Sequence, residues 1–162
     1  MLKNEDELPV FMCVGSDRVV GDSLAPIVSE YLIKKFKINA YVYGTLKNPI
    51  TAKNINSAYS FIKMKHKNSK IIVVDATLAN EDDVNFVKLE RFGVVPAGFF
   101  NGGSSVMGDY SILGVVGSKT LTDKMFLSSV RINSVLAMAY FIALSIDFAV
   151  RFSKILKREK MA

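Results

Sequence analysis

Residues 71–76 have the sequence IIVVDA, in which four β-branched residues precede an aspartate, Asp75. An uninterrupted apolar run of this kind is typical of a strand that is covered on both faces, as strands of parallel sheets are. A second apolar run, at residues 10–14, leads into the loop GSDRVVGDSLAP at residues 15–26, which contains Asp22. The two runs predict buried strands of a parallel sheet, each followed by an aspartate.

These two aspartates predict a shared site. Ligands of open α/β sheets bind at the carboxyl ends of the strands, and both Asp22 and Asp75 would reach that edge. Two close carboxylates do not both ionise cheaply, so one is able to hold a proton near neutral pH while the other acts as a base. Structural roles stay open. Asp22 precedes a helix, whose positive end an acidic residue stabilises, and Asp75 also suits a turn after a strand.

The expected elements follow the order of an α/β domain. Strands are predicted at residues 10–14, 40–43 and 71–75, separated by helices at about 23–37, where Ser23 is the expected N-cap, and 52–65. Two or three further strands are predicted at 84–89, 94–100 and 110–116, and a long C-terminal helix begins at Thr122 or Asp123 and runs to about Lys157. We therefore expect a three-layer α/β sandwich with a mixed, mostly parallel sheet.

Length and composition indicate one domain in a reducing compartment. The 162 residues suffice for a single core, with a polar N-terminal tail at 1–8 and a domain at 9–158. The single cysteine, Cys13, lies inside the first strand and forms no intramolecular disulfide. No signal peptide pattern is seen at the N-terminus. A cytoplasmic location is therefore expected.

The charge and the apolar C-terminal segment each raise an alternative. The net charge is +6, but its lysines gather near the ends of predicted helices, where cations complement the helix dipole. With no continuous basic face or known motif, nucleic-acid binding is not expected. An acidic protein partner is about as compatible with the positive charge as a nucleic acid is. In the apolar segment 125–150, only 15 residues separate Arg131 from Asp147, fewer than the roughly 20 of a membrane span. We expect a helix packed on the sheet and no membrane partner.

Several motifs together resemble the YyaC family of spore proteases, relatives of the germination protease of spore-forming bacteria. The loop at residues 15–26 carries the main resemblance. Further matches are VYGTL at 42–46, VVDA at 73–76, GDYSI at 108–112 and GVV at 114–116. They occur in the right order and cover most of the chain.

This resemblance implies a phosphorylase/hydrolase-like fold shared with the hydrogenase maturation endopeptidases. It also implies catalytic aspartates at Asp22, in a DALGP-like motif, and at Asp75, in a strand-ending DA motif. Ser23 and Ala25 replace the Ala and Gly of the first motif. The Pro-Gly-rich loop near the family's site corresponds to FFNGGSS at 99–105, without the proline.

Secondary candidates for binding substrate or shaping the site are Asp17, Arg18, Gly102, Gly103 and Asp109. The resemblance also raises the question of a metal, because hydrogenase maturation enzymes use a histidine ligand to sense nickel. The only histidine, His66, stands between two lysines at a helix end, so we expect neither a metal nor another cofactor.

Other catalytic arrangements fit the sequence less well. His66 is distant in the pattern from the serines near the site, and Cys13 is inside a strand, so Ser–His and Cys–His nucleophiles are not favoured. The loop at 15–21 lacks the spacing and the lysine of a phosphate-binding loop, and Asp22 would repel phosphate. Nucleotide binding is therefore a weak third hypothesis.

The function favoured by the sequence is that of a sporulation-associated peptidase that acts through paired aspartates. Its expected substrates are proteins or peptides, among them spore proteins, and its expected location is the cytoplasm of the sporulating cell or the spore interior. The alternative is a non-catalytic sporulation protein that uses the peptidase fold as a binding module, because fold alone does not guarantee activity. The oligomeric state is left open.

Overall fold

The computed structural model describes residues 8–95, 106–119 and 130–159. Its sheet has five strands in the order β2-β1-β3-β5-β4. They are β1 (Val10–Cys13), β2 (Tyr41–Tyr43), β3 (Ile71–Ala79), β4 (Val87–Glu90) and β5 (Tyr110–Ser118). Every neighbouring pair is parallel except β4 and β5, which are antiparallel. The expected mixed, mostly parallel sheet is confirmed.

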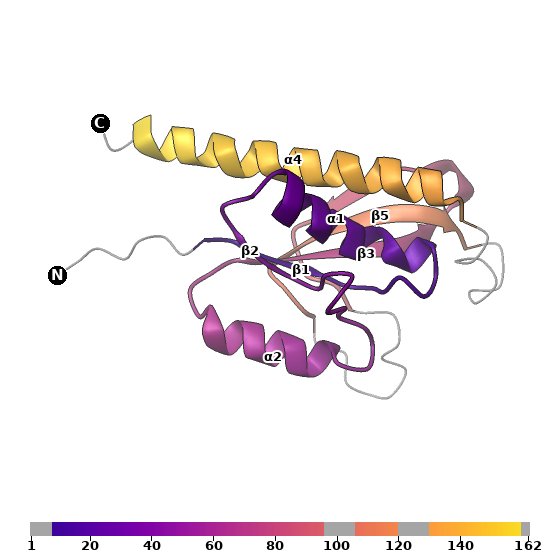
Figure 1. Cartoon of the computed structure of the whole chain (residues 1–162), viewed down its shortest axis with the longest axis horizontal. Coiled ribbons are helices and arrows are strands. Elements are labelled where there is room, and N and C mark those ends of the chain that lie inside the picture. Colours follow the sequence, from indigo (N-terminus) through magenta and orange to yellow (C-terminus); the bar gives the residue numbers. More distant parts are fainter. Residues whose placement is uncertain (1–7, 96–105, 120–129, 160–162) are drawn as a thin grey trace.

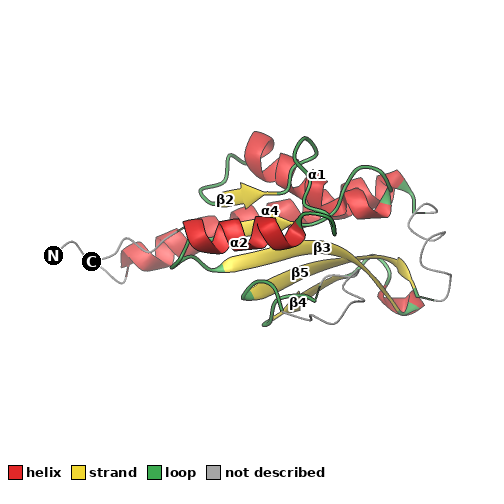
Figure 2. Ribbon diagram, turned by 90° about the horizontal axis from the view of Figure 1, so that it is seen from below, coloured by secondary structure: helices red, strands yellow, loops and turns green. Residues whose placement is uncertain are grey.

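Helices cover both faces of this sheet (Figure 1). On one face lie α1 (Leu24–Glu30), which continues as a π-helical turn over Tyr31–Lys35, and the long C-terminal helix α4 (Ile132–Glu159). On the other face lies α2 (Ile55–Lys65). The same layers are seen from below in Figure 2. The chain therefore has the expected three-layer α/β architecture with a long C-terminal helix.

Each layer boundary contains its own hydrophobic core, which explains the uninterrupted apolar strands. Successive side chains of a strand point to opposite faces. In β1, Phe11 and Cys13 join the core beneath α1 and α4, whereas Val10 and Met12 join the core above α2. Because both faces of β1 are covered, no polar residue interrupts it.

The strand order reverses its direction between β1 and β3. From β1 the chain passes through α1 to β2 on one side, and from β2 it crosses through α2 to β3 on the other side of β1. The two connections lie on opposite faces of the sheet (Figure 1). In α/β sheets this reversal opens a crevice at the carboxyl ends of the two central strands, where ligands bind.

The structure corrects several boundaries. Strand β3 continues to Ala79, so Asp75 lies within the strand rather than at its end. Val94 forms only an isolated bridge with Met107. Ser23 makes no capping hydrogen bond, because its hydroxyl donates to the carbonyl of Val20 at 2.6 Å. The predicted helix starts at residues 122 and 123 lie outside the described residues.

Helix α4 is the one described helix long and apolar enough to cross a membrane by length and composition, over Ile132–Leu156. One face of it packs on the sheet through Val135, Ala139, Ile142 and Ile146. The expected packing of this helix on the sheet is thus observed for one of its faces.

Candidate active site

Asp75 lies at the carboxyl edge of the central strands because β3 is longer than β1. The pairing of β1 with β3 ends at Cys13 and Val74, one residue before Asp75. Beyond this point β3 pairs only with β5, where Leu113 is the partner of Asp75. The Asp75 side chain is partly buried, and one of its oxygens accepts a hydrogen bond from the Ala76 N–H at 2.7 Å. Asp75 therefore stands at the carboxyl edge of β1 although it is inside β3.

Asp22 approaches Asp75 from the loop that follows β1. It lies in a 3-10 turn, Gly21–Ser23, directly before α1. Its Oδ2 accepts hydrogen bonds from the Ser16 N–H at 2.8 Å and the Ser16 hydroxyl at 3.2 Å. Both bonds end on Oδ2, so they hold the Asp22 carboxyl group in a fixed position.

Close packing of the loop holds Asp22 in this position. Gly15 has a φ of +133°, and a Cβ on it would lie 2.1 Å from the Asp22 carbonyl oxygen and 3.2 Å from Asp22 Oδ1. Only glycine fits this backbone conformation and this contact. The Gly15 N–H donates to the Ile50 carbonyl at 2.7 Å, so the loop is fixed to the next connection as well.

Asp22 and Asp75 interact electrostatically, as two close carboxylates at one edge were expected to do. The pKa of Asp75 is raised from 3.8 to about 8, first by burial and then by the negative charge of Asp22, and the bond from Ala76 only partly opposes this. At neutral pH, Asp75 is therefore mainly a neutral acid beside Asp22. A proton donor next to a hydrogen-bonded carboxylate is a pair suited to general acid–base catalysis.

Of the secondary candidates, Asp17 and Arg18 are exposed on the loop between β1 and Asp22. Gly102 and Gly103, with the remainder of the loop at 99–105, lie outside the described residues, so their contribution stays a prediction.

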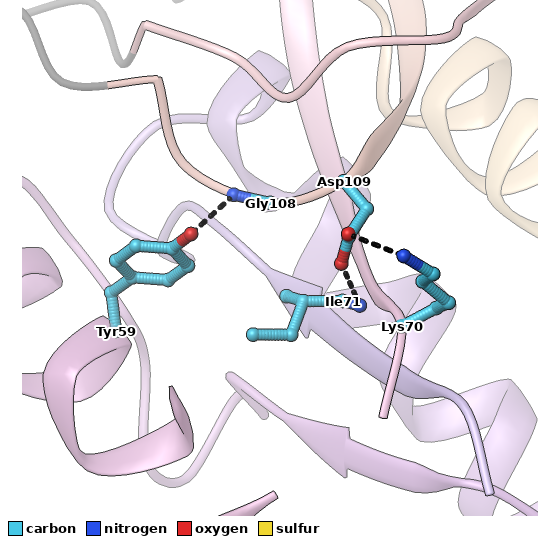
Figure 3. Close-up of polar contacts among 5 residues, drawn as sticks. All are labelled: Tyr59, Lys70, Ile71, Gly108 and Asp109. Carbon is cyan, nitrogen blue, oxygen red and sulfur yellow. Dashed lines mark hydrogen bonds and ion pairs between the residues drawn. The ribbon is translucent and has the colours of Figure 1, made fainter. Parts of the chain in front are cut away.

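Asp109 lies at the opposite edge of the sheet from the pair. Its carboxylate accepts hydrogen bonds from the Ile71 N–H at 2.8 Å and from Lys70 Nζ at 3.0 Å (Figure 3). Ile71 begins β3, and four residues of strand, about 13 Å, separate it from Asp75. The structure therefore does not bring Asp109 to the Asp22–Asp75 pair, and its position is that of a support for the start of β3.

The pKa of Asp109 fits this structural position. Burial opposes ionisation of Asp109, but the bonds from Ile71 and Lys70, together with the charges of Lys70 and Lys63, hold its pKa below the ordinary value. Beside it, the Tyr59 hydroxyl accepts a hydrogen bond from the Gly108 N–H at 3.0 Å (Figure 3). The GDYSI motif therefore anchors β5 to β3 and α2.

His66, which stands between two lysines just after α2, is buried. Its Nε2 is 2.8 Å from the Tyr43 hydroxyl, and its ring packs on Tyr41 with centroids 4.1 Å apart. It follows the last residue of α2, Lys65, near the start of β3 rather than its carboxyl end. Among residues 8–95, 106–119 and 130–159, no three His, Cys, Asp or Glu side chains form a group suited to a metal. These donors do not fit the histidine-containing set that the hydrogenase-protease resemblance raised.

Cys13 is unsuited to nucleophilic catalysis. It is fully buried in β1, and burial, followed by the charge of Asp75, strongly raises the pKa of its thiol. A thiol in this environment stays protonated and unreactive.

Sequence reasoning did not identify Ser16 and Gly15 as supports of Asp22. The available signal was the Gly-Ser pair directly after a buried strand. A loop that reverses direction there leaves backbone N–H groups free to bond a later residue of the same loop. Such a turn is a natural place for a carboxylate to accept hydrogen bonds.

Comparison with known families and proteins agrees with the resemblance of the motifs. Residues 1–145 match the family described as "Protein of unknown function (DUF1256)". Over 134 residues the chain is 32% identical to the "Uncharacterized protein YyaC" of Bacillus subtilis (strain 168). The match covers 83% of this chain and 65% of YyaC, so the chain spans slightly less than two thirds of that relative's length.

Two solved structures have a similar fold. One is the NiFe hydrogenase maturation protease HycI from Thermococcus kodakarensis KOD1, with a TM-score of 0.57 and 14% identity, covering 91% of this chain and 95% of HycI. The other is peptidyl-tRNA hydrolase from Acinetobacter baumannii, with a TM-score of 0.57 and 12% identity, covering 96% and 94% of the two chains. At these identities the likeness concerns the fold, which is peptidase-like but also carries other hydrolytic chemistry.

Proposed function

The chain belongs to the DUF1256 family, and from its peptidase-like fold together with the two interacting aspartates at the carboxyl edge of its sheet we propose that it is a peptidase that hydrolyses peptide bonds through Asp22 and Asp75. One observation carries the proposal. At the carboxyl edge of the central strands, burial and the charge of Asp22 keep the Asp75 carboxyl protonated up to about pH 8. Perturbed carboxyl groups in a crevice are a feature of catalytic sites.

The two aspartates have different environments, which assigns their roles. The Asp22 carboxylate accepts two hydrogen bonds from Ser16 and is oriented by them. It takes a proton from water as the water oxygen attacks the carbonyl carbon of the scissile bond. The protonated Asp75 gives its proton to the amide nitrogen as the C–N bond breaks. The products are a carboxylic acid and an amine. Transfer of the proton from Asp22 to the Asp75 carboxylate then returns the pair to its starting state.

The substrate class follows from this chemistry and from the family resemblance. A pair that protonates an amine leaving group acts on amide bonds, so the substrates are proteins or peptides, and the spore protease resemblance makes proteins of sporulating cells the first to test. The setting proposed is the cytoplasm of such cells. No metal takes part in this scheme.

Cleavage of spore proteins tests the proposal directly. Purified protein is incubated with an extract of small spore proteins and with a peptide library, and new termini are identified by mass spectrometry. We expect cleavage by the wild type and a loss of at least about 100-fold in Asp22→Asn and in Asp75→Asn, the size of a typical acid–base contribution. The matched control is Asp83→Asn, because Asp83 is a half-exposed aspartate that pairs with Lys88 and should leave the rate unchanged.

The alternative is a binding module, and the same experiment distinguishes it. Peptides that co-purify with the wild type and are never cleaved would identify the carboxyl edge of the sheet as a recognition site. Cleavage that persists in Asp22→Asn at the wild-type rate would overturn the catalytic assignment of the pair.

A further inference from the structure

The face of α4 that points away from the sheet exposes many large apolar side chains. The inner face of α4 is buried on the sheet, yet large apolar side chains are exposed along the other side, with Phe148 68% and Phe141 59% exposed. The exposed apolar residues of α4 that face away from the sheet, called the outer stripe below, are Ile132, Leu136, Phe141, Leu144, Phe148, Phe152, Ile155 and Leu156. Tyr140 is also partly exposed, but its ring packs against Tyr31 and Phe36. A helix that is apolar all round is typical of a buried helix, and an exposed patch of this length is typical of an interaction surface.

The position of α4 makes the outer stripe accessible. The helix is the outermost element along one side of the molecule, and in Figure 1 none of the described elements lies beyond it. With 28 residues, it is about 42 Å long. A partner able to cover the stripe therefore has to be similarly long and apolar.

The stripe has the spacing of a helix–helix seam. Phe141, Leu144 and Phe148 follow one another at intervals of three and four, and the exposed Ala137 precedes them by four. The next position at this spacing is the charged Arg151, and Ile155 follows it by four. Apolar residues at alternating intervals of three and four are the positions that a facing helix packs against in coiled coils. The occupant that this pattern favours is thus another helix.

We propose that the outer stripe is the interface of a homodimer, in which α4 of one subunit packs antiparallel on α4 of a second copy. A two-fold axis brings residues near it against their own copies, so a charge there would meet a like charge. From Ile132 to Val150 none of the exposed residues of α4 is charged. The one acid in this range, Asp147, is turned inward and pairs with Arg151 at 2.8 Å.

The area of the stripe is sufficient for a stable dimer. Exposed aromatic and aliphatic side chains of this number offer about 600 Å² on each subunit, because a fully buried aromatic side chain alone covers roughly 150–250 Å². Two such surfaces reach the lower part of the 1,200–2,000 Å² range of specific interfaces. The composition also fits, since interface cores are enriched in Phe, Tyr and Arg and depleted in Lys, Glu and Asp.

The distribution of charge favours the antiparallel orientation. Arg151 and Lys154 are exposed near the C-terminal end of α4. In a parallel pair these cations would lie beside their own copies, whereas in an antiparallel pair they lie at opposite ends of the interface. Antiparallel packing also opposes the two helix dipoles.

Light scattering on size-separated protein tests the dimer. We expect a mass twice the 17.9 kDa of the chain at micromolar concentration, and the monomer mass for Leu144→Glu and for Phe148→Glu, each checked for folding by circular dichroism. The matched control is Met64→Glu, which changes a 66% exposed apolar residue of α2, on the other face of the sheet, and should remain dimeric. A monomeric wild type, or a folded Leu144→Glu variant that stays dimeric, would overturn the proposal.

Spin labels test the orientation. Labels are attached at Ser145→Cys, near the middle of the helix, and separately at Asn133→Cys, near its start; the native Cys13 is fully buried and does not compete. An antiparallel dimer should give a distance below about 20 Å between the Ser145 labels and about 35–40 Å between the Asn133 labels. Two short distances would show a parallel pair. A monomer that co-sediments with phosphatidylglycerol vesicles would show that the stripe meets lipid instead, and would overturn the proposal.

Discussion

The carboxyl group of Asp75 lies within electrostatic reach of Asp22, and the two aspartates differ in their partners. Asp22 is held by both donors of Ser16, whereas Asp75 receives a hydrogen bond from the adjacent Ala76 N–H. Burial and the charge of Asp22 together raise the pKa of Asp75 to about 8. This arrangement lowers the stability of the fold as the pH rises. Above the ordinary pKa the unfolded chain releases the Asp75 proton, whereas the folded chain keeps it, so rising pH favours the unfolded chain. Local destabilisation of this kind is often found where a site serves function.

Asp75→Asn is expected to stabilise the fold at alkaline pH. Between pH 4 and 8 the folded chain keeps a proton on Asp75 that the unfolded chain releases, so stability is lost as the pH rises through this window. The neutral asparagine removes this loss. We expect the free energy of unfolding of the Asp75→Asn variant to exceed that of the wild type by on the order of 3 kcal/mol at pH 8 and by much less at pH 4.5. Urea unfolding measures both differences.

A stabilising effect would separate a catalytic Asp75 from a structural one. If the ionised carboxylate were needed by neighbouring N–H groups, its replacement would instead cost about 1–3 kcal/mol. Lower stability of Asp75→Asn at pH 8, with unchanged cleavage, would contradict the catalytic assignment.

Cleavage is expected to decline on the alkaline side of about pH 8. In the proposed mechanism Asp75 donates a proton, and its protonated fraction falls tenfold for each pH unit above its pKa. The measurement is kcat/KM from pH 6 to 10 with a peptide identified in the cleavage experiment. A rate that stays level up to pH 9.5, in protein shown to remain folded, would exclude Asp75 as the proton donor.

The position of the pair could be predicted from sequence because its signals are local. Buried parallel strands have a distinctive uninterrupted apolar pattern, and both aspartates stand beside such runs. The extension of β3 to Ala79 could not be predicted, since residues 76–79 are a weak strand signal and depend on pairing with β5. That pairing joins segments distant in the sequence.

Asp109 and His66 show where local reasoning fails. Asp109 precedes β5, so it lies at the amino edge of the sheet, and the motif resemblance did not convey this direction. The charged neighbours of His66 gave no sign that two tyrosines of β2 contact its ring. The outer stripe of α4 was likewise interpreted only as core, because hydropathy does not say which side of a helix the sheet covers.

Asp109→Ala is expected to destabilise the fold without a direct effect on the pair. The change leaves the Ile71 N–H without its acceptor and Lys70 without its partner, so we expect a loss of about 1–2 kcal/mol at pH 7. The pKa of Asp109 is lowered, so its contribution is present above the ordinary pKa and disappears as the pH falls through the lowered one. Urea unfolding at pH 7 and pH 2.5 measures this. An equal loss at both values would contradict a role for the ionised carboxylate.

Gly15→Ala is expected to damage the site and the fold together. The added Cβ would lie 2.1 Å from the Asp22 carbonyl oxygen, a backbone atom, and an alanine would have to adopt a φ of +133°. At a compatible site, replacing glycine by alanine raises the free energy of unfolding by up to about 1 kcal/mol, and at an incompatible site it lowers it by more than that. We therefore expect Gly15→Ala to lower the free energy of unfolding by more than about 1 kcal/mol. Because the clash involves Asp22 itself, the loop has to move and the bonds from Ser16 are lost with it. The melting temperature and the cleavage rate should therefore decrease together. Asp75 would also lose the nearby charge of Asp22 that helps to raise its pKa. A variant as stable and active as the wild type would show that the loop does not hold Asp22 against Gly15.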